Sequence, residues 1–307
     1  MFSLPRCARI KSSNSIFHIM VRSISEVMLF KTAFDKKQYL DFIKSYQKIY
    51  NFKVYAYCLM SNHGHFLIDS NGADISKIMH SINLKYAKNF NKRYKRHGHL
   101  FQDRFKSKII TSDQYLITVS AYIHNNPIDI KKYRKHPEKY EFSSLPVYLG
   151  LKKDSFQILD EDFIMQLFNH DVNKARNNYK SLMNMCTDEN VIKEIEFNEE
   201  KTIYKSERKI IIRNFSSDDI MDFVSAKTGV DKFKLYIKNS HSNTKARALC
   251  VLLMRGLCNF KCSDICKSLG NITQSRVSSL CSMGINIIDT DPQFKNIINN
   301  FILTYKV

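Results

Sequence analysis

The sequence predicts an α+β fold, in which a ferredoxin-like antiparallel sheet with helices is followed by an all-α helix-turn-helix domain. In residues 1–150, strand-like and helix-like periodicities alternate in the order βαββαβ and end with a further helix. From Ser216 onward the apolar residues follow helical spacing throughout. Between these parts, residues 151–200 carry 6 Lys and Arg against 11 Asp and Glu. We therefore predict three regions, 1–150, 151–212 and 213–307, of which the second is an acidic helical connector.

The elements of the first region follow from local patterns. Alternating apolar residues predict strands, and apolar residues three and four apart predict helices. Strands are expected at 15–21, 52–60, 66–69 and 106–110, and helices at 34–49, 75–94 and from 111 to about 125. The third helix has the N-cap candidates Thr111, Ser112 and Asp113, and it should end before Pro127.

The last region shows only helical patterns. Ser216 is expected to cap a helix whose Ile220, Phe223 and Val224 face inward. Further helices are expected at about 244–257, 263–269, 273–283 and 292–305. A short helix that ends at Gly270 and is followed by another helix is the helix-turn-helix pattern.

The chain is strongly basic, with a formal net charge of +19. Residues 1–150 hold 25 Lys and Arg against 10 Asp and Glu, and residues 201–307 hold 17 against 8. Such an excess favours a polyanionic partner, either nucleic acid or an anionic membrane surface. No run of about 18 apolar residues could span a membrane, and no apolar signal core follows Arg9. We therefore expect a cytoplasmic, nucleoid-associated protein with no membrane partner.

The eight cysteines include no C-x-x-C pair, which argues against a zinc ribbon or a disulfide framework. Cys258, Cys262 and Cys266 follow one another at intervals of four residues. We interpret them as small apolar residues on helices rather than as metal ligands.

The tripeptide His63-Gly64-His65 lies in a strand-like segment. Alternate residues of a strand point to the same face, so both imidazoles could bind one cation. The alternative is a structural or solvated histidine pair. The tripeptide recurs at His97-Gly98-His99, but there it lies in a basic, loop-like segment. We interpret this second copy as a phosphate-contacting hairpin, with a solvated loop as the alternative.

A second candidate element is Tyr122-Ile-His-Asn-Asn126-Pro127, at the end of the predicted third helix. Tyr122 and Asn126 are four residues apart and therefore share one helix face. The tyrosine could act as a nucleophile while Asn126 offers a carbonyl oxygen to a metal. The alternative is a tyrosine that packs on the sheet and an asparagine that ends the helix.

The two histidines, the basic loop at 98–105 and the Tyr122 segment occur in an order that resembles one family. It is the HUH single-strand transposases, and within them the REP-associated tyrosine transposases. The resemblance covers about residues 1–150. It includes Leu4-Pro-Arg6, Phe17-His-Ile-Met-Val-Arg22, Leu29-Phe30, Tyr57-Cys-Leu-Met-Ser-Asn-His-Gly-His65 and Phe142-Ser-Ser144.

The resemblance implies an HUH fold and a role for each matching residue. His63, His65 and Asn126 would bind a divalent metal, Mg²⁺ or Mn²⁺, which would polarise the scissile phosphate. Tyr122 would attack the phosphorus, leaving a 5′-phosphotyrosine link and a free 3′-OH, and the link would conserve energy for rejoining. The implied partners are single-stranded and hairpin DNA. The family includes monomers and homodimers, so Tyr122 could act in its own subunit or in a partner's.

Two positions depart from the family's pattern. Gly64 stands where a bulky apolar residue is more usual, and a glycine is expected to loosen the strand. Met60-Ser61-Asn62 stands where Met-Pro-Asn is usual, which removes a rigid turn. Neither change deletes a catalytic atom.

Basic residues surround these motifs with few acids among them, which favours a DNA track over a solvated helix face. The residues expected to contact DNA here are Arg6, Arg22, Lys92, Arg93, Arg96, His99, Gln102, Arg104 and Lys106. Because His63, His65 and Tyr122 are all present, a strand transferase is favoured. The alternatives are a domesticated DNA-binding regulator that does not cleave and, more remotely, a metal-dependent nuclease.

The last region resembles the DNA-binding domain of the bacterial replication initiator DnaA. The resemblance rests on Thr244-Lys-Ala-Arg247, Cys262-Ser-Asp-Ile-Cys-Lys-Ser-Leu-Gly270 and the segment after Thr273. It implies that Gln274, Ser275 and Arg276 face the major groove of duplex DNA. The initiator's Asp-His-Thr-Thr signature is absent, so its sequence specificity is not implied. The alternative is a small helical interaction domain.

Overall fold

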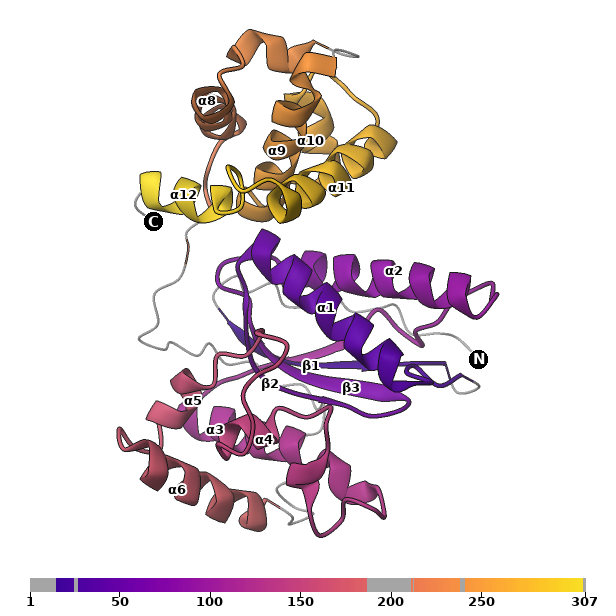
Figure 1. The fold of residues 1–307 in the computed structure, drawn as a ribbon, viewed down its shortest axis with the longest axis vertical. Helices are drawn as coiled ribbons and strands as arrows, with labels where there is room; N and C mark the ends of the chain where they lie inside the picture. Colours follow the sequence, from indigo (N-terminus) through magenta and orange to yellow (C-terminus); the bar gives the residue numbers. More distant parts are fainter. Residues whose placement is uncertain (1–14, 25–26, 187–210, 212, 238–240, 306–307) are drawn as a thin grey trace.

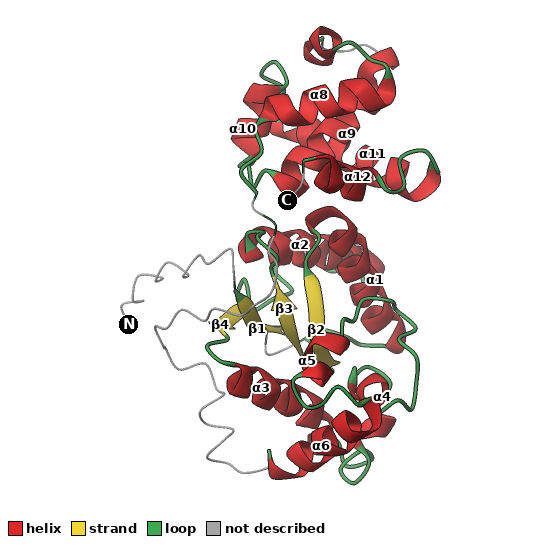
Figure 2. Cartoon of the chain, turned by 90° about the vertical axis from the view of Figure 1, so that its left-hand side faces the viewer, coloured by secondary structure: helices red, strands yellow, loops and turns green. Residues whose placement is uncertain are grey.

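The computed structural model describes residues 15–24, 27–186, 211, 213–237 and 241–305. Its centre is a four-stranded antiparallel sheet in the order β2-β3-β1-β4 (Figures 1 and 2). The strands are β1 (Ile16–Arg22), β2 (Lys53–Leu59), β3 (His63–Asp69) and β4 (Lys106–Ile109). This is the order of a ferredoxin-like sheet, so the fold class that the sequence predicts is confirmed.

The register of the two central strands assigns each side chain to a face. Val21 of β1 pairs with Gly64 of β3, and Met20 pairs with His65. Successive residues of a strand alternate between faces, so Val21 and Gly64 share one face, and Met20 and His65 the other.

Helices α1 (Ala33–Tyr50) and α2 (Ile75–Arg93) cover the Gly64 face (Figure 2). On that face the ring of Tyr39 in α1 stacks on Phe66 of β3, with centroids 5.7 Å apart. A capping box starts α1, because Thr32 and Asp35 bind each other's backbone N–H groups. Asn51 ends α1 in the left-handed conformation, at φ 50°.

A second layer covers the opposite face of the sheet, which carries His63 and His65 (Figure 1). Its first helix is α3 (Asp113–Asn125), which Ser112 caps by accepting the N–H of Tyr115. It also contains the short helices η1 (Asn126–Asp129), η2 (Pro137–Lys139), α4 (Leu145–Tyr148) and α5 (Asp162–Gln166), and α6 (Val172–Met185).

Residues 151–186, which the sequence assigns to an acidic connector, are packed into this second layer. The apolar stripe Ala175, Tyr179 and Met183 of α6 is buried. The hydroxyl of Tyr179 donates to Ser120 of α3 at 3.0 Å. The stretch packs because α6 is amphipathic, whatever its net charge.

The C-terminal part is a helical bundle. Its helices are α8 (Ser217–Thr228), η3 (Lys232–Tyr236), α9 (His241–Leu257), α10 (Cys262–Ser268), α11 (Gln274–Thr290) and α12 (Ile297–Thr304). Ser216 caps α8, and Ile220, Phe223 and Val224 are buried, as predicted. Helix α11 extends seven residues beyond the predicted end, and α12 begins five residues later than expected.

The bundle lies against α1 and α2 (Figure 1). Arg213 is buried there and donates to the carbonyl oxygens of Tyr50, Asn71 and Gly256. Gly256 of α9 lies so close to the carbonyl oxygen of Ile49 in α1 that a Cβ would overlap it. The α9 helix is thus docked directly on the end of α1. Over the part of the chain that the structure describes, no helix is long and apolar enough to cross a membrane.

Candidate active site

His63 and His65 converge on the α3 side of the sheet, with ring centroids 5.1 Å apart. His65 is buried, whereas His63 at the start of β3 is half-buried. Burial lowers the pKa of both imidazoles, and that of His65 well below its ordinary value. Both rings are therefore neutral at pH 7 and able to bind a cation.

Asn126 faces His63 across the gap between the sheet and α3. Its Oδ1 lies 3.3 Å from Nε2 of His63. Its Nδ2 donates to the carbonyl oxygens of Tyr122 and Ile123, which turns Oδ1 towards the histidine. The predicted convergence of the two motifs is therefore present in the structure.

The protons of this pair leave a place for a cation. Nδ1 of His63 lies 2.6 Å from Oδ1 of Asn62 and Nε2 lies 3.3 Å from Oδ1 of Asn126, so the single proton of the neutral ring can serve only one of these contacts. In the tautomer that donates from Nδ1 to Asn62, Nε2 of His63 and Oδ1 of Asn126 are both acceptors, and a cation can lie between them. Two neighbouring ligands of one small octahedral cation lie about 3 Å apart. The donor set of His63, His65 and Asn126 therefore fits a divalent metal.

Tyr122 completes the site from α3. Its ring meets the rings of His65 and His18 edge to face, with centroids 5.6 and 5.9 Å away. Tyr122 is half-buried. Helix α3 thus places Tyr122 and Asn126 on the same side of the site.

The residues between Tyr122 and Asn126 fasten α3 in this orientation. His124 is fully buried and hydrogen-bonds with the hydroxyls of Tyr179 and Ser144, at 2.6 and 2.7 Å. Burial lowers the pKa of His124 to about 3, so it acts as a neutral bridge. The adjacent Asn125 donates to the carbonyl oxygen of Met183 at 2.9 Å.

A third histidine, His18, was not among the predicted site residues. It lies on β1, 0% exposed, and its Nε2 is 3.0 Å from Nδ1 of His65. Burial, with a smaller contribution from the positive charge of Lys108, lowers the pKa of His18 to about 3. Its segment Phe17-His-Ile-Met was visible in the sequence, but only the β1–β3 register shows that His18 is next to His65.

The turn before His63 is held without the missing proline. The N–H of Met60 donates to the carbonyl oxygen of His63 at 2.9 Å. From outside the turn, the N–H of Phe30 donates to Ser61 and that of Ser23 to Asn62. These contacts supply the rigidity that a proline would otherwise provide.

The space beside Gly64 is already filled. A Cβ there would lie 2.9 Å from Leu59 Cδ2, 3.2 Å from Phe66 Cε2 and 3.4 Å from Val21 Cγ2. Gly64 also faces α1 and α2 rather than the site, so the core and not the ligand geometry accounts for this departure.

A Gly64→Leu substitution is expected to lower the free energy of unfolding by about 1–3 kcal/mol, because the core has no room for the added carbons. Gly64→Ala is the milder control, since its single carbon meets only side-chain atoms of Leu59, Phe66 and Val21, and Leu59 is approached most closely at its movable tip. Urea unfolding measures both, and a leucine variant as stable as the wild type would contradict the packing argument.

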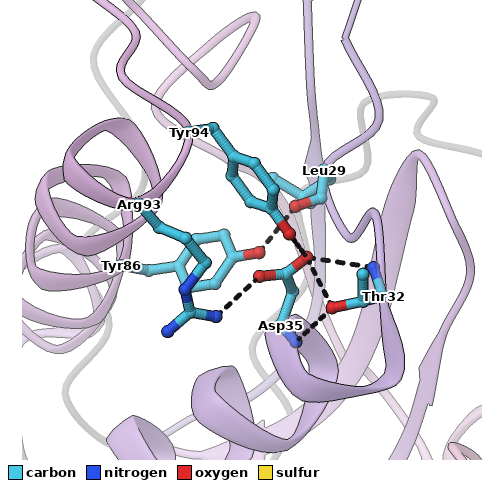
Figure 3. Close-up of polar contacts among 6 residues, drawn as sticks. All are labelled: Leu29, Thr32, Asp35, Tyr86, Arg93 and Tyr94. Carbon is cyan, nitrogen blue, oxygen red and sulfur yellow. Dashed lines mark hydrogen bonds and ion pairs between the residues drawn. The ribbon is translucent and has the colours of Figure 1, made fainter.

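Arg93, one of the predicted DNA contacts, is tied to a buried carboxylate (Figure 3). Its Nη1 lies 3.2 Å from Oδ1 of Asp35, and its guanidinium stacks over Phe34. Oδ2 of the same aspartate accepts hydrogen bonds from the hydroxyl of Tyr94 at 2.8 Å and from both N and Oγ1 of Thr32 (Figure 3). Asp35 thus joins the start of α1 to the end of α2, where the basic loop begins.

Asp35→Ala is expected to destabilise the protein by about 3 kcal/mol, because it removes a cap and leaves the hydroxyl of Tyr94 and the guanidinium of Arg93 without their carboxylate. Thermal unfolding checks the stability, and proteolysis within 94–105 checks the loop. The control is Asp41→Ala on the exposed side of α1. Equal stability of the two variants would contradict the role given to Asp35.

The other predicted DNA contacts lie around the loop. His99, Gln102 and Arg104 line a groove of about 780 Å³ between α2 and residues 98–105. Arg96 donates to Oδ1 of Asn91 at 3.3 Å. Lys92 and Lys106 are exposed, and the exposed Arg22 pairs with His63 in the register of β1 and β3. Arg6 lies outside the described residues.

In the bundle, the three residues predicted to contact DNA, Gln274, Ser275 and Arg276, form the first turn of α11. Gln274 and Ser275 are exposed and Arg276 is half-buried. Thr273 caps the helix by accepting the N–H of Arg276 at 3.2 Å. Gly270, at φ 78°, makes the turn from α10 in a conformation that favours glycine.

Comparison with known proteins bears on the first region. Residues 11–126 match the family model described as "Transposase IS200 like". A solved structure of a REP-associated tyrosine transposase bound to a REP hairpin is 16% identical, with a TM-score of 0.41, and the match covers 49% of this chain and 89% of that one. No curated protein matches the chain. The segment that contains His63, His65, Tyr122 and Asn126 is therefore similar to the IS200-like transposases.

Proposed function

We propose that the chain is a transposase that cleaves and rejoins single-stranded DNA through a 5′-phosphotyrosine intermediate. One observation carries the proposal. Two atoms that can bind a cation, Nε2 of His63 and Oδ1 of Asn126, face each other at 3.3 Å, and Tyr122 lies beside them against His65. A cation site next to a phenol is the arrangement that phosphoryl transfer to tyrosine requires.

The metal would be held by His63, His65 and Asn126. A bound Mg²⁺ or Mn²⁺ would polarise the scissile phosphate. The two imidazole nitrogens favour Mn²⁺, because Mg²⁺ strongly prefers oxygen ligands.

Tyr122 supplies the nucleophile. Its phenolic oxygen forms a bond to phosphorus while the bond from phosphorus to the 3′ oxygen breaks, and a proton ends on the released 3′-OH. The phosphate remains a diester throughout, so the reverse attack by a 3′-OH rejoins DNA without ATP. The buried bonds of His124 and the amide of Asn125 hold α3, and with it the phenol, at a constant distance from the histidines.

DNA would reach the site along the basic surface. The exposed Arg22, next to His63, would contact phosphate near the scissile bond, while His99, Gln102 and Arg104 would contact the strand in the groove beside α2. In the bundle, α10 and α11 would act as a DnaA-like helix-turn-helix. The first turn of α11 would enter the major groove of duplex DNA.

The decisive experiment mixes the purified full chain, Mn²⁺ and labelled single-stranded hairpin DNA. The transposase is expected to yield an adduct that survives SDS, with a free 3′-OH on the other fragment. Hairpin binding without an adduct across many substrates would instead support the alternative function, a domesticated DNA-binding regulator. A free 5′ phosphate without attached protein would support a nuclease.

A further inference from the structure

The imidazole of His18 is the immediate neighbour of a proposed metal ligand. Its Nε2 lies 3.0 Å from Nδ1 of His65, and the two rings stack with centroids 5.2 Å apart. Both side chains are buried on the inner strands of the sheet. Water is therefore a poor substitute for this contact.

One proton lies between the two nitrogens, and its position decides what His65 can do. If Nδ1 of His65 carries it, Nε2 of His65 has a lone pair for a cation. If Nε2 of His18 carries it, the neutral His65 must hold its own proton on Nε2, where it blocks coordination. The position of this proton thus decides whether His65 can bind a metal.

We propose that His18 is a positioning residue, which accepts the Nδ1 proton of His65 and thereby keeps Nε2 of His65 free for a divalent cation. The inference rests on the proposed function, because it concerns the same site. Histidine ligands in proteins usually donate their second N–H to a carboxylate or a backbone carbonyl. Here another imidazole takes that place.

The surroundings of His18 hold it beside His65. The β1–β3 register sets its distance from His65, because Met20 and His65 are direct partners and His18 pairs with Leu67. The ring of Tyr122 closes over both imidazoles, with centroids 5.9 Å from His18 and 5.6 Å from His65. His18 therefore acts through His65 and holds it while the phenol packs against the pair.

The first test observes the proton directly. Nitrogen-15 NMR of the metal-free wild-type protein distinguishes a protonated from an unprotonated nitrogen in each histidine ring. His65 is expected to carry its proton on Nδ1. A proton on Nε2 of His65 would overturn the inference, whatever the affinity of the protein for metal.

The second test uses two substitutions of similar volume. His18→Leu removes the acceptor, whereas His18→Gln offers an amide oxygen close to the position of Nε2. The leucine variant is expected to shift the proton of His65 to Nε2 and to weaken Mn²⁺ binding without DNA by about tenfold to a hundredfold. The glutamine variant is expected to keep the Nδ1 proton and to bind Mn²⁺ nearly as tightly as the wild type.

Tyr39→Leu is the control, because it also replaces a fully buried side chain that has a hydrogen bond, here to Oδ1 of Asn83, but on the opposite face of the sheet. It should lose thermal stability yet leave the His65 proton and Mn²⁺ affinity unchanged. If His18→Leu and Tyr39→Leu weaken Mn²⁺ binding equally, the effect is structural and the inference fails. If the wild type forms no DNA adduct but His65 responds to His18 as expected, only the proposed function fails.

Discussion

Tyr122→Phe is expected to abolish the covalent DNA adduct, with a loss of at least about a thousandfold in rate. The substitution removes one oxygen, and that oxygen is the atom that would bond to phosphorus. The ring that packs edge to face on His65 and His18 is retained, so the fold and the histidines should be unaffected. Adduct formation with Mn²⁺ and labelled hairpin DNA measures the effect, and a gel-shift assay should show unchanged binding.

Tyr115→Phe is the matched control. Tyr115 lies on the same face of α3, two turns before Tyr122, and is also half-buried. Its variant should form the adduct at the wild-type rate. If Tyr122→Phe still gave an SDS-resistant adduct, another residue would be the nucleophile, and the interpretation of the Tyr122 segment would be wrong.

The part of the site that local patterns predicted was the pair of motifs. An alternation of two placed His63 and His65 on one face of a strand, and a spacing of four placed Tyr122 and Asn126 on one side of a helix. The two motifs meet because the helix after β4 covers the histidine face. Each motif is defined by residues that are close together in the sequence, so both could be recognised without the structure.

The rest of the site depends on contacts between distant residues. His18 is 47 residues from His65, and a shift of one residue in strand register would place it on the other face. Arg93 looked like one cation of a basic stripe, but its carboxylate partner Asp35 is 58 residues away. Neither contact produces a periodic pattern in the sequence. The strand register reveals the contact of His18 with His65, and the packing of α1 on α2 reveals that of Arg93 with Asp35.

Composition was a weaker guide to the middle region than helix periodicity. Counting charges assigned residues 151–212 to an acidic connector, of which 187–210 and 212 lie outside the described residues, whereas the spacing of Ala175, Tyr179 and Met183 already formed an apolar stripe. The buried hydroxyl of Tyr179 then bonds to both Ser120 and His124, so α6 supports the helix that carries Tyr122. A region predicted to link two domains thus contributes to the stability of the site.

The contact between the bundle and the first region should break if Gly256 acquires a side chain. A Cβ at this position would overlap the carbonyl oxygen of Ile49, which is backbone and cannot rotate away. In Gly256→Ala, α9 must therefore move off the end of α1. Arg255 would lose its bonds to Tyr50 and Ser81, both at 3.1 Å. We expect the free energy of unfolding to fall by about 2–4 kcal/mol and the protein to unfold in two separate transitions in place of one.

Arg213→Met tests the same contact without a steric clash. The methionine keeps the apolar stem but leaves the carbonyl oxygens of Tyr50, Asn71 and Gly256 without their donor. Each of these oxygens that stays buried is expected to lower the free energy of unfolding by about 1–3 kcal/mol. Gly229→Ala is the control, because its left-handed φ of 69° costs stability in the bundle while no atom lies within 4 Å of the added carbon. Calorimetry and limited proteolysis should separate the regions in the first two variants only.

The two proposed DNA-binding surfaces lie on different parts of the chain, and this separation has a functional consequence. His63, His65 and Tyr122 belong to the first region, so Gly256→Ala should still form the adduct on a short hairpin. The first turn of α11 lies on the docked bundle, whose contact with α1 sets its distance from the phenol. Any gain in adduct rate from duplex DNA that flanks the hairpin should therefore disappear in this variant. An equal gain in adduct rate in the variant and the wild type would show that the bundle binds DNA independently of its contact with α1.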